Sequence, residues 1–250
     1  MRIISLVPSI TETLFDLGLT AEEIVGRTKF CIHPKDWVGN VEIIGGTKNL
    51  NIEKIKALKP DLIIANKEEN VKEQVEELMK DFKVLVTNIE TLEDNYYLLK
   101  QLGHLFGKEE KAKYFNLKTY EAFDLREPEK RLKTVYLIWK NPYMTVGGDT
   151  FISRILEELG FENLFKNQKR YPEVELKNLK NADLIFLSSE PFPFQEKHMD
   201  EIRDVCQNQK ILIVDGEAFS WYGTHLAKCG SYYKKLIENI LKTTKVTKGK

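Results

Sequence analysis

Histidines are the first candidates for chemistry, because imidazole ligates metals and transfers protons near neutral pH. No two of the four histidines have the i, i+4 spacing of a helical metal pair, and no HExxH motif occurs. His104 lies in the amphipathic run LLKQLGHLF, which predicts a packed or surface residue, and His198 lies among charges, which predicts exposure. His33 and His225 come after aromatic residues in expected loops and remain open as ligands.

A catalytic nucleophile and a phosphate loop are not evident in the sequence. There is no GxSxG motif, and Ser220 has no base beside it in sequence. The glycine-rich stretches at 45–48 and 146–150 have neither the GxxxxGK[ST] nor the GxGxxG spacing. Both are better interpreted as turns that open a helix, with Thr150 as the helix cap. An enzyme would therefore need a reactive constellation that these motifs do not supply.

Aromatic residues instead gather where expected strands end. The segments are GRTKFCIHP near Phe30, IWKNPYMTVGG near Trp139, SSEPFPF, and EAFSWYGTH around Trp221. Three of them follow the carboxyl end of an expected strand, which is the edge where open α/β sheets bind ligands. Flat rings there suit a large, planar, partly apolar ligand. The alternative is a set of rim residues that pack into local clusters.

Short apolar runs alternate with helical patterns, which predicts an α/β fold with mostly parallel strands. The expected strands are 3–7, 62–65, 84–87, 134–139, 184–187 and 211–214. Ser9 with Glu12 fits a capping box that opens the first helix, and Thr20 with Glu23 repeats the pattern for a second start. Gly18 is expected to end the first helix.

A weak internal sequence repeat indicates two similar halves, because IKALKPDLII at 55–64 resembles LKNLKNADLIF at 176–186. Between them, the stretch 108–130 has no glycine and one late proline, which predicts one long, stiff helix. The expected organisation is an N-terminal α/β lobe at 1–107, a connecting helix at 108–130, a C-terminal α/β lobe at 131–243 and a disordered tail at 244–250.

The composition excludes several classes of protein. Lys and Arg number 38, as do Asp and Glu, so the formal net charge is zero and the basic surplus typical of nucleic-acid binders is missing. No apolar run is long enough to span a membrane. The three cysteines are far apart and are expected to be buried or free thiols. No export signal precedes the first strand, so we expect a cytoplasmic protein as written, or a periplasmic or membrane-associated one if a leader was removed.

Several stretches together resemble the substrate-binding proteins of ABC transporters that carry cobalamin, haem or iron–siderophores. In the first half these are RIISLVPSITETLFDLG, VGRTKFCIHP and GGTKNLNIEKIKALKPDLIIA. In the second half they are NPYMTVGGDTFISRILEELGFENLF, RYPEVELKNLKNADLIFLSSEPFPF and DGEAFSWYG. The resemblance covers about residues 2–240 in consistent order and is greatest to the cobalamin-binding branch.

This resemblance implies two Rossmann-like lobes joined by a single long backbone helix, with the ligand in a cleft between the lobes. The positions that match the family's ligand contacts are Phe30, His33, Trp139, Tyr143, Arg170, Tyr171, Ser220, Trp221 and Tyr222. His33 is also a candidate axial ligand for a bound metal. Each lobe of the family usually presents a surface glutamate to the transporter, and Glu73 and Glu196 are the nearest candidates.

The function expected on these grounds is non-catalytic binding of cobalamin or another corrinoid, with delivery to an ABC transporter permease or a role as a carrier. No cofactor is expected to be required, and we expect a monomer. Two alternatives remain open. One is a receptor for a ferric siderophore, haem or a metal ion, and the other is a cytoplasmic α/β enzyme.

Overall fold

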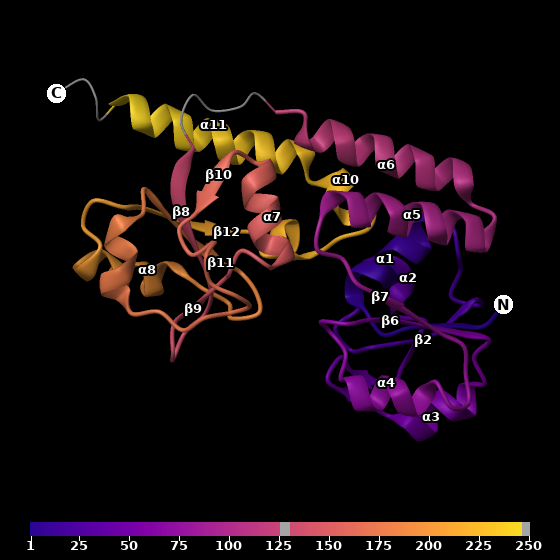
Figure 1. Ribbon diagram of the computed structural model, residues 1–250. Helices are drawn as coiled ribbons and strands as arrows, with labels where there is room; N and C mark the ends of the chain where they lie inside the picture. Colours follow the sequence, from indigo (N-terminus) through magenta and orange to yellow (C-terminus); the bar gives the residue numbers. More distant parts are fainter. Residues whose placement is uncertain (126–130, 247–250) are drawn as a thin grey trace. The chain divides into compact units, whose positions relative to one another are not determined.

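Two mainly parallel sheets organise the chain (Figure 1). The computed structural model describes residues 1–125 and 131–246. Unit 1 comprises Met1–Ile89, Glu93–Glu121 and Tyr222–Lys228. Unit 2 comprises Glu90–Leu92, Ala122–Trp221 and the residues from Cys229 onward. The two units of α/β structure agree with the expected fold class.

The sheet of unit 1 has the strand order β3-β2-β1-β6-β7, and all neighbouring strands are parallel. The strands are β1 (Ile3–Ser5), β2 (Ile24–Arg27), β3 (Glu42–Ile43), β6 (Leu62–Asn66) and β7 (Val84–Thr87). A small antiparallel hairpin pairs β4 (Gly45–Gly46) with β5 (Asn49–Leu50). Because all strands of the sheet run the same way, their carboxyl ends lie at one edge, and the expected ligand residues follow those ends.

Helices cover both faces of this sheet, as parallel strands require. The helices are α1 (Pro8–Asp16), α2 (Lys35–Val38), α3 (Ile52–Leu58), α4 (Lys72–Leu78), α5 (Leu92–Phe106) and α6 (Glu109–Phe123). In Figure 1, α1 and α5 lie on one side of the sheet, and α3 and α4 on the other. Strand residues such as Ile3, Ile4 and Ile63 have no exposed surface.

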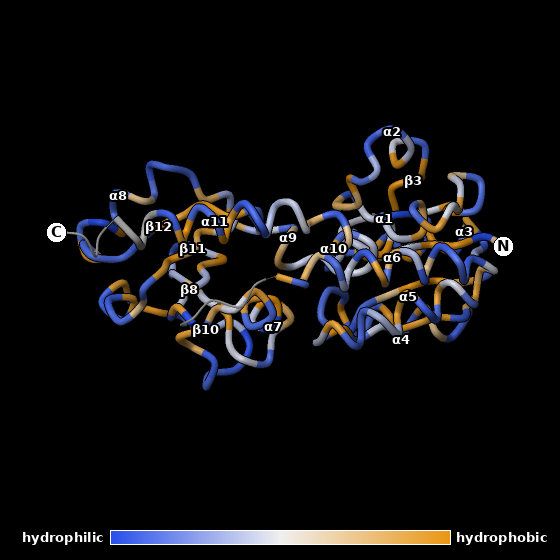
Figure 2. Tube along the Cα trace, turned by 90° about the horizontal axis from the view of Figure 1, so that it is seen from above, coloured by the Kyte–Doolittle hydropathy of each residue, from blue (hydrophilic) through white to orange (hydrophobic). Residues whose placement is uncertain are grey.

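The sheet of unit 2 has the order β10-β8-β11-β12, again parallel, with β9 pairing antiparallel to β8. The strands are β8 (Leu132–Trp139), β9 (Met144–Thr145), β10 (Phe161–Asn163), β11 (Leu184–Ser188) and β12 (Lys210–Val214). The helical elements are α7 (Phe151–Glu158), η1 (Leu176–Asn181), α8 (Glu196–Val205), α9 (Glu217–Ser220) and α11 (Gly230–Val246). The β11 segment is coloured hydrophobic in Figure 2, in keeping with a strand that helices cover on both faces.

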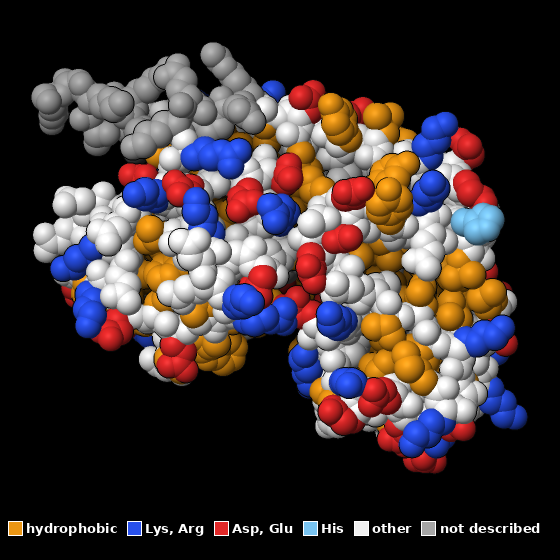
Figure 3. Space-filling view, viewed as in Figure 1, with side chains coloured by type: hydrophobic (Ala, Val, Ile, Leu, Met, Phe, Trp, Pro, Cys, Tyr) orange, Lys and Arg blue, Asp and Glu red, His pale blue; other side chains and the backbone are white. Residues whose placement is uncertain are grey.

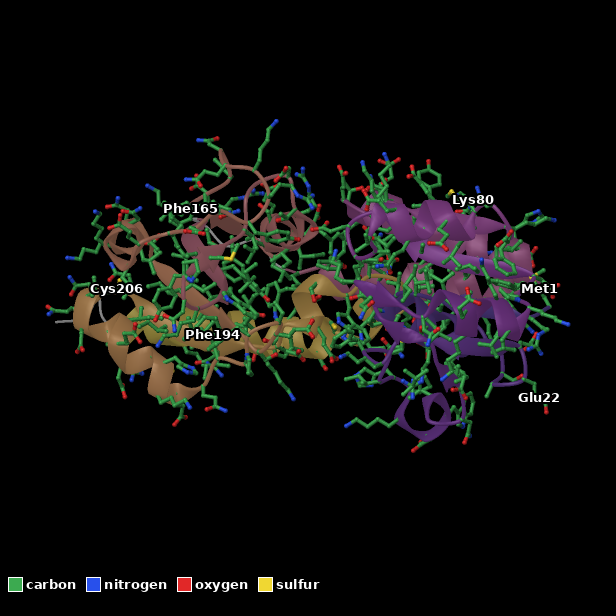
Figure 4. The ribbon with its side chains drawn as sticks, turned by 90° about the horizontal axis from the view of Figure 1, so that it is seen from below. Met1, Glu22, Lys80, Phe165, Phe194 and Cys206 are labelled. Atoms are coloured by element: carbon green, nitrogen blue, oxygen red, sulfur yellow. The ribbon has the colours of Figure 1, made fainter. Side chains whose placement is uncertain are left out.

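Successive residues of strand β8 pack on opposite faces of the sheet of unit 2, because side chains alternate along a strand with a period of two residues. Val135 and Leu137 of β8 join a buried cluster with Ile202 of α8. Figure 4 labels three further members of this cluster, which are Phe165, Phe194 and Cys206. Tyr136 lies between the first two in sequence, and its ring instead packs on Phe219 at a centroid distance of 5.1 Å.

The first helix begins earlier than the sequence pattern predicts. Its N-cap is Val7 with Pro8 in the first turn, so the expected capping box of Ser9 with Glu12 is wrong. Proline has no N–H to satisfy and a backbone angle suited to the first turn, which favours this earlier start. The N–H of Thr20 does donate to Glu23 Oε2 at 3.0 Å, but no helix starts there, because residues 21–23 form a turn that leads into β2. Gly18 ends α1 with a positive φ of 97°, as expected.

The long helix expected at 108–130 is α6, Glu109–Phe123, and the division between the units falls inside it. Residues 126–130 of that expectation lie outside the described residues. The segment α10 (His225–Lys228) belongs to unit 1, so the chain also returns to that unit late in the sequence. Helix α11 runs to Val246, so the first residues of the expected tail are helical, and 247–250 lie outside the described residues. Within the described residues, no helix is long and apolar enough to cross a membrane.

Candidate ligand-binding site

The loop after β2 is held from beneath by the buried guanidinium of Arg27. Its Nε donates to the carbonyl of Val38 at 2.8 Å, and one terminal nitrogen donates to the carbonyls of Thr28 at 3.2 Å and Cys31 at 3.1 Å. The Cys31 thiol is fully buried, and burial raises its pKa. These contacts satisfy the backbone of a loop that could otherwise not be buried. Phe30 is thereby presented on a fixed loop, 49% exposed.

The Phe30 ring lies against the backbone of the hairpin formed by β4 and β5. A Cβ placed on Gly46 would lie 3.3 Å from the Phe30 ring, so glycine permits this close approach. Lys29 lies with its ammonium 5.0 Å from the centre of the same ring. In the same loop region, Lys48 donates to the carbonyl of Glu68 at 2.7 Å. Unit 1 therefore offers an accessible ring with the Lys29 ammonium beside it, in the loop that follows β2.

His33 and His225 come together within unit 1, with ring centroids 6.4 Å apart. The Nδ1 of His225 lies 2.8 Å from one carboxylate oxygen of Glu12, and Lys228 donates to the other oxygen at 2.9 Å. Burial alone would raise the pKa of Glu12, but the hydrogen bonds and charges of His225 and Lys228 outweigh it and lower that pKa. Asp16 also pairs with Lys228, at 2.5 Å.

The segment from Tyr222 to Lys228, here called the return arm, is anchored on unit 1 along its length. The N–H of Gly223 donates to the side chain of Asn95, and the N–H of Thr224 donates to the Thr13 hydroxyl at 3.1 Å. Tyr222 is 5% exposed, and burial raises its pKa. This aromatic residue was expected to contact the ligand, and the structure places its side chain in the interior.

Trp139 opens an aromatic row in unit 2. Its ring is 40% exposed and meets Phe192 edge to face at 5.8 Å. Phe192 in turn packs on Phe194 at 4.8 Å and on His198 at 5.3 Å. The buried end of the row is Phe194, within the core of the unit, so the exposed Trp139 ring rests on a rigid support.

Tyr143 lies close to the Trp139 end of β8 and is half-buried. Lys140 pairs with Glu201 of α8, and its ammonium lies 5.9 Å from the centre of the Tyr143 ring. Burial raises the pKa of Tyr143, and the nearby carboxylate of Glu201 adds to that rise. The phenol therefore stays neutral throughout the physiological pH range.

Arg170 is exposed and has an unusual backbone, with a positive φ of 59°. Its N–H donates to the carboxylate of Asp149 at 2.5 Å, and its carbonyl accepts the N–H of Gly147 at 2.7 Å. The guanidinium carbon lies 5.6 Å from the centre of the Tyr171 ring. Because the backbone of Arg170 is held in place, its guanidinium is suited to bind a carboxylate or phosphate of a ligand.

Ser220 and Trp221 end the stretch that follows β12. The Ser220 hydroxyl donates to Glu190 Oε1 at 2.8 Å, and the Trp221 indole N–H donates to the same oxygen at 3.2 Å. Trp221 is only 7% exposed, so most of its ring is covered. Glu190 is a functional candidate that the sequence reasoning missed, because SSEPFPF was interpreted for its aromatic residues alone.

The remaining expectations fall outside these clusters. His104 is a surface residue, with its side chain 87% exposed, as expected. His198 was expected to be exposed, but it is half-buried, and its ring accepts the N–H of Gln195 at 2.9 Å to close the capping box of α8. Glu73 and Glu196 are exposed, each in the first turn of its helix. Among residues 1–125 and 131–246, no group of three or more His, Cys, Asp and Glu side chains is arranged to hold a metal ion.

Each unit thus offers the same kind of surface at the carboxyl edge of its sheet. The surface consists of half-exposed aromatic rings on well-packed loops, with cationic side chains beside them. Such surfaces bind flat, partly apolar molecules that carry anionic or polar groups. On the visible face in Figure 3, acidic and basic side chains are interspersed, which agrees with the balanced composition.

Comparison with known proteins shows which family model and which relatives the chain matches. A model of the family described as periplasmic binding protein matches residues 3–208. The vitamin B12-binding protein of Salmonella typhimurium is 31% identical over 179 residues, which make up 69% of this chain and 66% of that protein, just under two thirds of its length.

Solved structures share the fold over nearly the whole chain. The periplasmic vitamin B12 binding protein BtuF of Vibrio cholerae aligns with a TM-score of 0.79 and 21% identity, over 95% of this chain and 97% of that chain. A structure from Staphylococcus epidermidis, described as a possible iron-binding (periplasmic solute-binding) protein, aligns with a TM-score of 0.77 and 27% identity, over 96% and 98% of the two chains.

Proposed function

The chain belongs to the periplasmic binding protein family, and from that premise we propose that it binds cobalamin or a related corrinoid without transforming it. In this proposal the corrinoid is cargo and no resident cofactor takes part. The cargo is delivered to an ABC transporter permease or retained by the protein as a carrier. The observation that carries the proposal is the 31% identity to a vitamin B12-binding protein, joined to exposed rings at the strand ends.

The residues proposed to touch the ligand are those whose side chains are accessible. In unit 1 these are Phe30 and His33, and His33 is the proposed axial ligand of a bound metal. In unit 2 they are Trp139, Tyr143, Arg170, Tyr171 and Ser220. Trp221 and Tyr222, which were also expected to touch the ligand, are 7% and 5% exposed, so little of either ring is accessible.

Titration with cyanocobalamin tests the proposal, with tryptophan fluorescence and the visible spectrum of the corrinoid as readouts. Saturable quenching at micromolar concentrations is the expected result. Replacement of Trp139 by alanine removes an exposed ring, and we expect about tenfold weaker binding, the scale of one lost stacking contact. Absence of binding at about a hundred times that concentration contradicts the proposal.

Trp37 provides the matched control. It is 54% exposed, like Trp139, but it lies on α2, packs against Phe15 at 6.0 Å and is not one of the proposed contacts. Trp37→Ala should leave the affinity for cyanocobalamin unchanged. An equal loss of affinity in both variants would assign the effect to general destabilisation.

A second candidate function is binding of an iron chelate. It is favoured by the 27% identity to a protein described as possible iron-binding, and by the cationic side chains Lys29 and Arg170 at the strand ends. Competition between cyanocobalamin, haemin and a ferric siderophore separates the two. Displacement of bound cyanocobalamin by an iron chelate that is present at a lower concentration than the cyanocobalamin would favour the second candidate.

Docking on a permease is a further part of the proposal. Glu73 on α4 and Glu196 on α8 are exposed carboxylates that could pair with basic residues of a transporter. Glu22, an exposed carboxylate of unit 1 outside α4, is the control residue, because Glu77 lies one turn from Glu73 on the same helix face. Glu73→Lys should reduce ligand-dependent stimulation of a reconstituted transporter, whereas Glu22→Lys should not.

A further inference from the structure

A carboxylate joins two neighbouring strand-end loops of unit 2. Glu190 follows β11, and its Oε1 accepts hydrogen bonds from residues that follow β12. The donors are the Ser220 hydroxyl at 2.8 Å and the Trp221 indole at 3.2 Å. A single oxygen thus fixes one proposed ligand contact, Ser220, together with the buried ring that supports it.

The Glu190 side chain has little freedom to leave this position. A Cβ placed on Gly216 would lie 2.4 Å from Glu190 Cγ and 2.6 Å from Ser188 Oγ, so the backbone of one loop abuts the side chains of the other. The N–H of Gly216 also donates to Ser189 Oγ at 2.9 Å, and Ser188 Oγ donates to the carbonyl of Glu190 at 2.5 Å. The two loops are therefore locked together around the carboxylate.

The surroundings of Glu190 oppose its ionisation. Burial raises its pKa, the hydrogen bonds from Ser220 and Trp221 act in the other direction, and the carboxylates of Glu217 and Asp215 raise it further. Glu217 belongs to α9 and Asp215 to the turn before it. From α11, the Tyr232 hydroxyl accepts the N–H of Asp215 at 2.9 Å.

The strand β8 supplies a further titratable group near Glu190. Its Tyr136 hydroxyl lies 3.0 Å from Ser188 Oγ, and burial holds the pKa of this phenol well above its usual range. Tyr136 therefore stays neutral when Glu190 titrates. Glu217 and Asp215, whose charges raise the pKa of Glu190, are both carboxylates, so negative charge accumulates around Glu190 when it ionises.

We propose that Glu190 is a positioning residue for the ligand, whose ionised carboxylate holds Ser220 and Trp221 in the binding arrangement and releases them on protonation. The physical reason is that a carboxylate makes charge-assisted hydrogen bonds, which are about twice as strong as those to a neutral acid. Binding therefore weakens as the pH falls. This inference rests on the proposed function for the identity of the ligand.

The test compares the wild-type protein with Glu190→Gln between about pH 8 and about pH 5. The variant keeps the size of the side chain and one acceptor oxygen but cannot ionise. Wild-type affinity for cyanocobalamin should fall about tenfold with acidification, on the scale of one hydrogen bond to a charged group. Glu190→Gln should bind about tenfold more weakly at the alkaline end and show no such pH dependence. Identical pH profiles in the two proteins would overturn the inference.

A second variant keeps the test decisive if Glu190→Gln folds poorly. Glu217→Gln removes a neighbouring negative charge and leaves both hydrogen bonds in place, so the midpoint of the pH transition should move to lower pH. An unmoved midpoint counts against Glu190 as the titrating group.

A ligand-free readout separates this inference from the proposed function. The emission of Trp221 should change with pH as its hydrogen bond weakens, and the change should be lost in both Glu190→Gln and Trp221→Phe. If cyanocobalamin does not bind at any pH but this transition is present, the ligand assignment fails and the role of Glu190 stands. A transition that persists in Glu190→Gln refutes that role.

Discussion

Glu12 offers the sharpest test of how the return arm is held on unit 1. Its carboxylate has a side chain only 6% exposed and pairs with His225 and Lys228, both from the arm. The change Glu12→Gln keeps the shape of the side chain and removes its charge. One of the two contacts then faces an amide N–H₂ group instead of an acceptor oxygen.

The magnitude follows from the geometry. Hydrogen bonds to charged groups contribute about 1.5–3 kcal/mol. Lys228 is 42% exposed and keeps Asp16 as a partner, so the contact with Lys228 is discounted for solvent screening. We therefore expect the free energy of unfolding of unit 1 to fall by about 2 kcal/mol, a decrease of about 4–8 °C in melting temperature for a chain of this size.

Urea denaturation followed by circular dichroism measures the effect, and Glu22→Gln is the control. Glu22 lies just after α1, is exposed, and undergoes the same change of charge. The control should change stability by less than about 0.5 kcal/mol. A Glu12→Gln effect no larger than that of the control would refute the view that the buried pairing anchors the arm.

The pH dependence supplies an independent check with a defined sign. The pKa of Glu12 in the folded protein lies below its ordinary value of 4.5. A depressed carboxylate pKa contributes stability that is fully present above the unfolded value and lost as the pH falls through the folded one. The difference between wild type and Glu12→Gln should therefore stay constant near neutral pH and shrink in acid below pH 4.5. A difference that grows in acid has the wrong sign for this mechanism.

Three further outcomes are expected. Trp221→Ala should lower the free energy of unfolding by about 3 kcal/mol in thermal or urea unfolding, because a ring 7% exposed leaves a cavity when removed. Thr150→Ala should cost about 1 kcal/mol, since the Thr150 hydroxyl accepts the N–H of Ser153 at 3.2 Å and caps α7, and Thr150→Ser should restore most of it. Cys31 should react with a thiol reagent only after denaturation, because it is buried and burial raises its pKa; rapid labelling of the native protein would contradict this.

Much of the fold follows from apolar runs in the sequence. The six expected strands all form, because buried parallel strands need near-continuous aliphatic residues. The strands β2, β3, β4, β5, β9 and β10 were missed, because their two to four residues carry too little pattern. The false capping box at Ser9 and Glu12 shows the limit of local motifs. Glu12 fits the motif by spacing but pairs instead with residues more than 200 positions away.

The sequence predicted the kind of side chain at the candidate site, but not which of these side chains are buried or how they are held. Rings that follow strand ends, such as Trp139 and Phe30, are indeed half exposed there. The burial of Trp221 could not be predicted, because an aromatic next to a serine and a glycine looks the same whether its ring is covered or open. Glu190 offers no local signal either, since a carboxylate becomes noteworthy only once its donors, thirty residues further along the chain, are known.

The return arm has a practical consequence for dissecting this protein into fragments. A piece that stops after α6 would contain every strand of the first sheet but would lack the late heptapeptide that completes its interior. Thr13, Asn95 and Glu12 would then lose their hydrogen-bond partners on the arm and be exposed to water. A soluble half-molecule would therefore need that heptapeptide grafted back through a linker, or added in trans as a synthetic peptide.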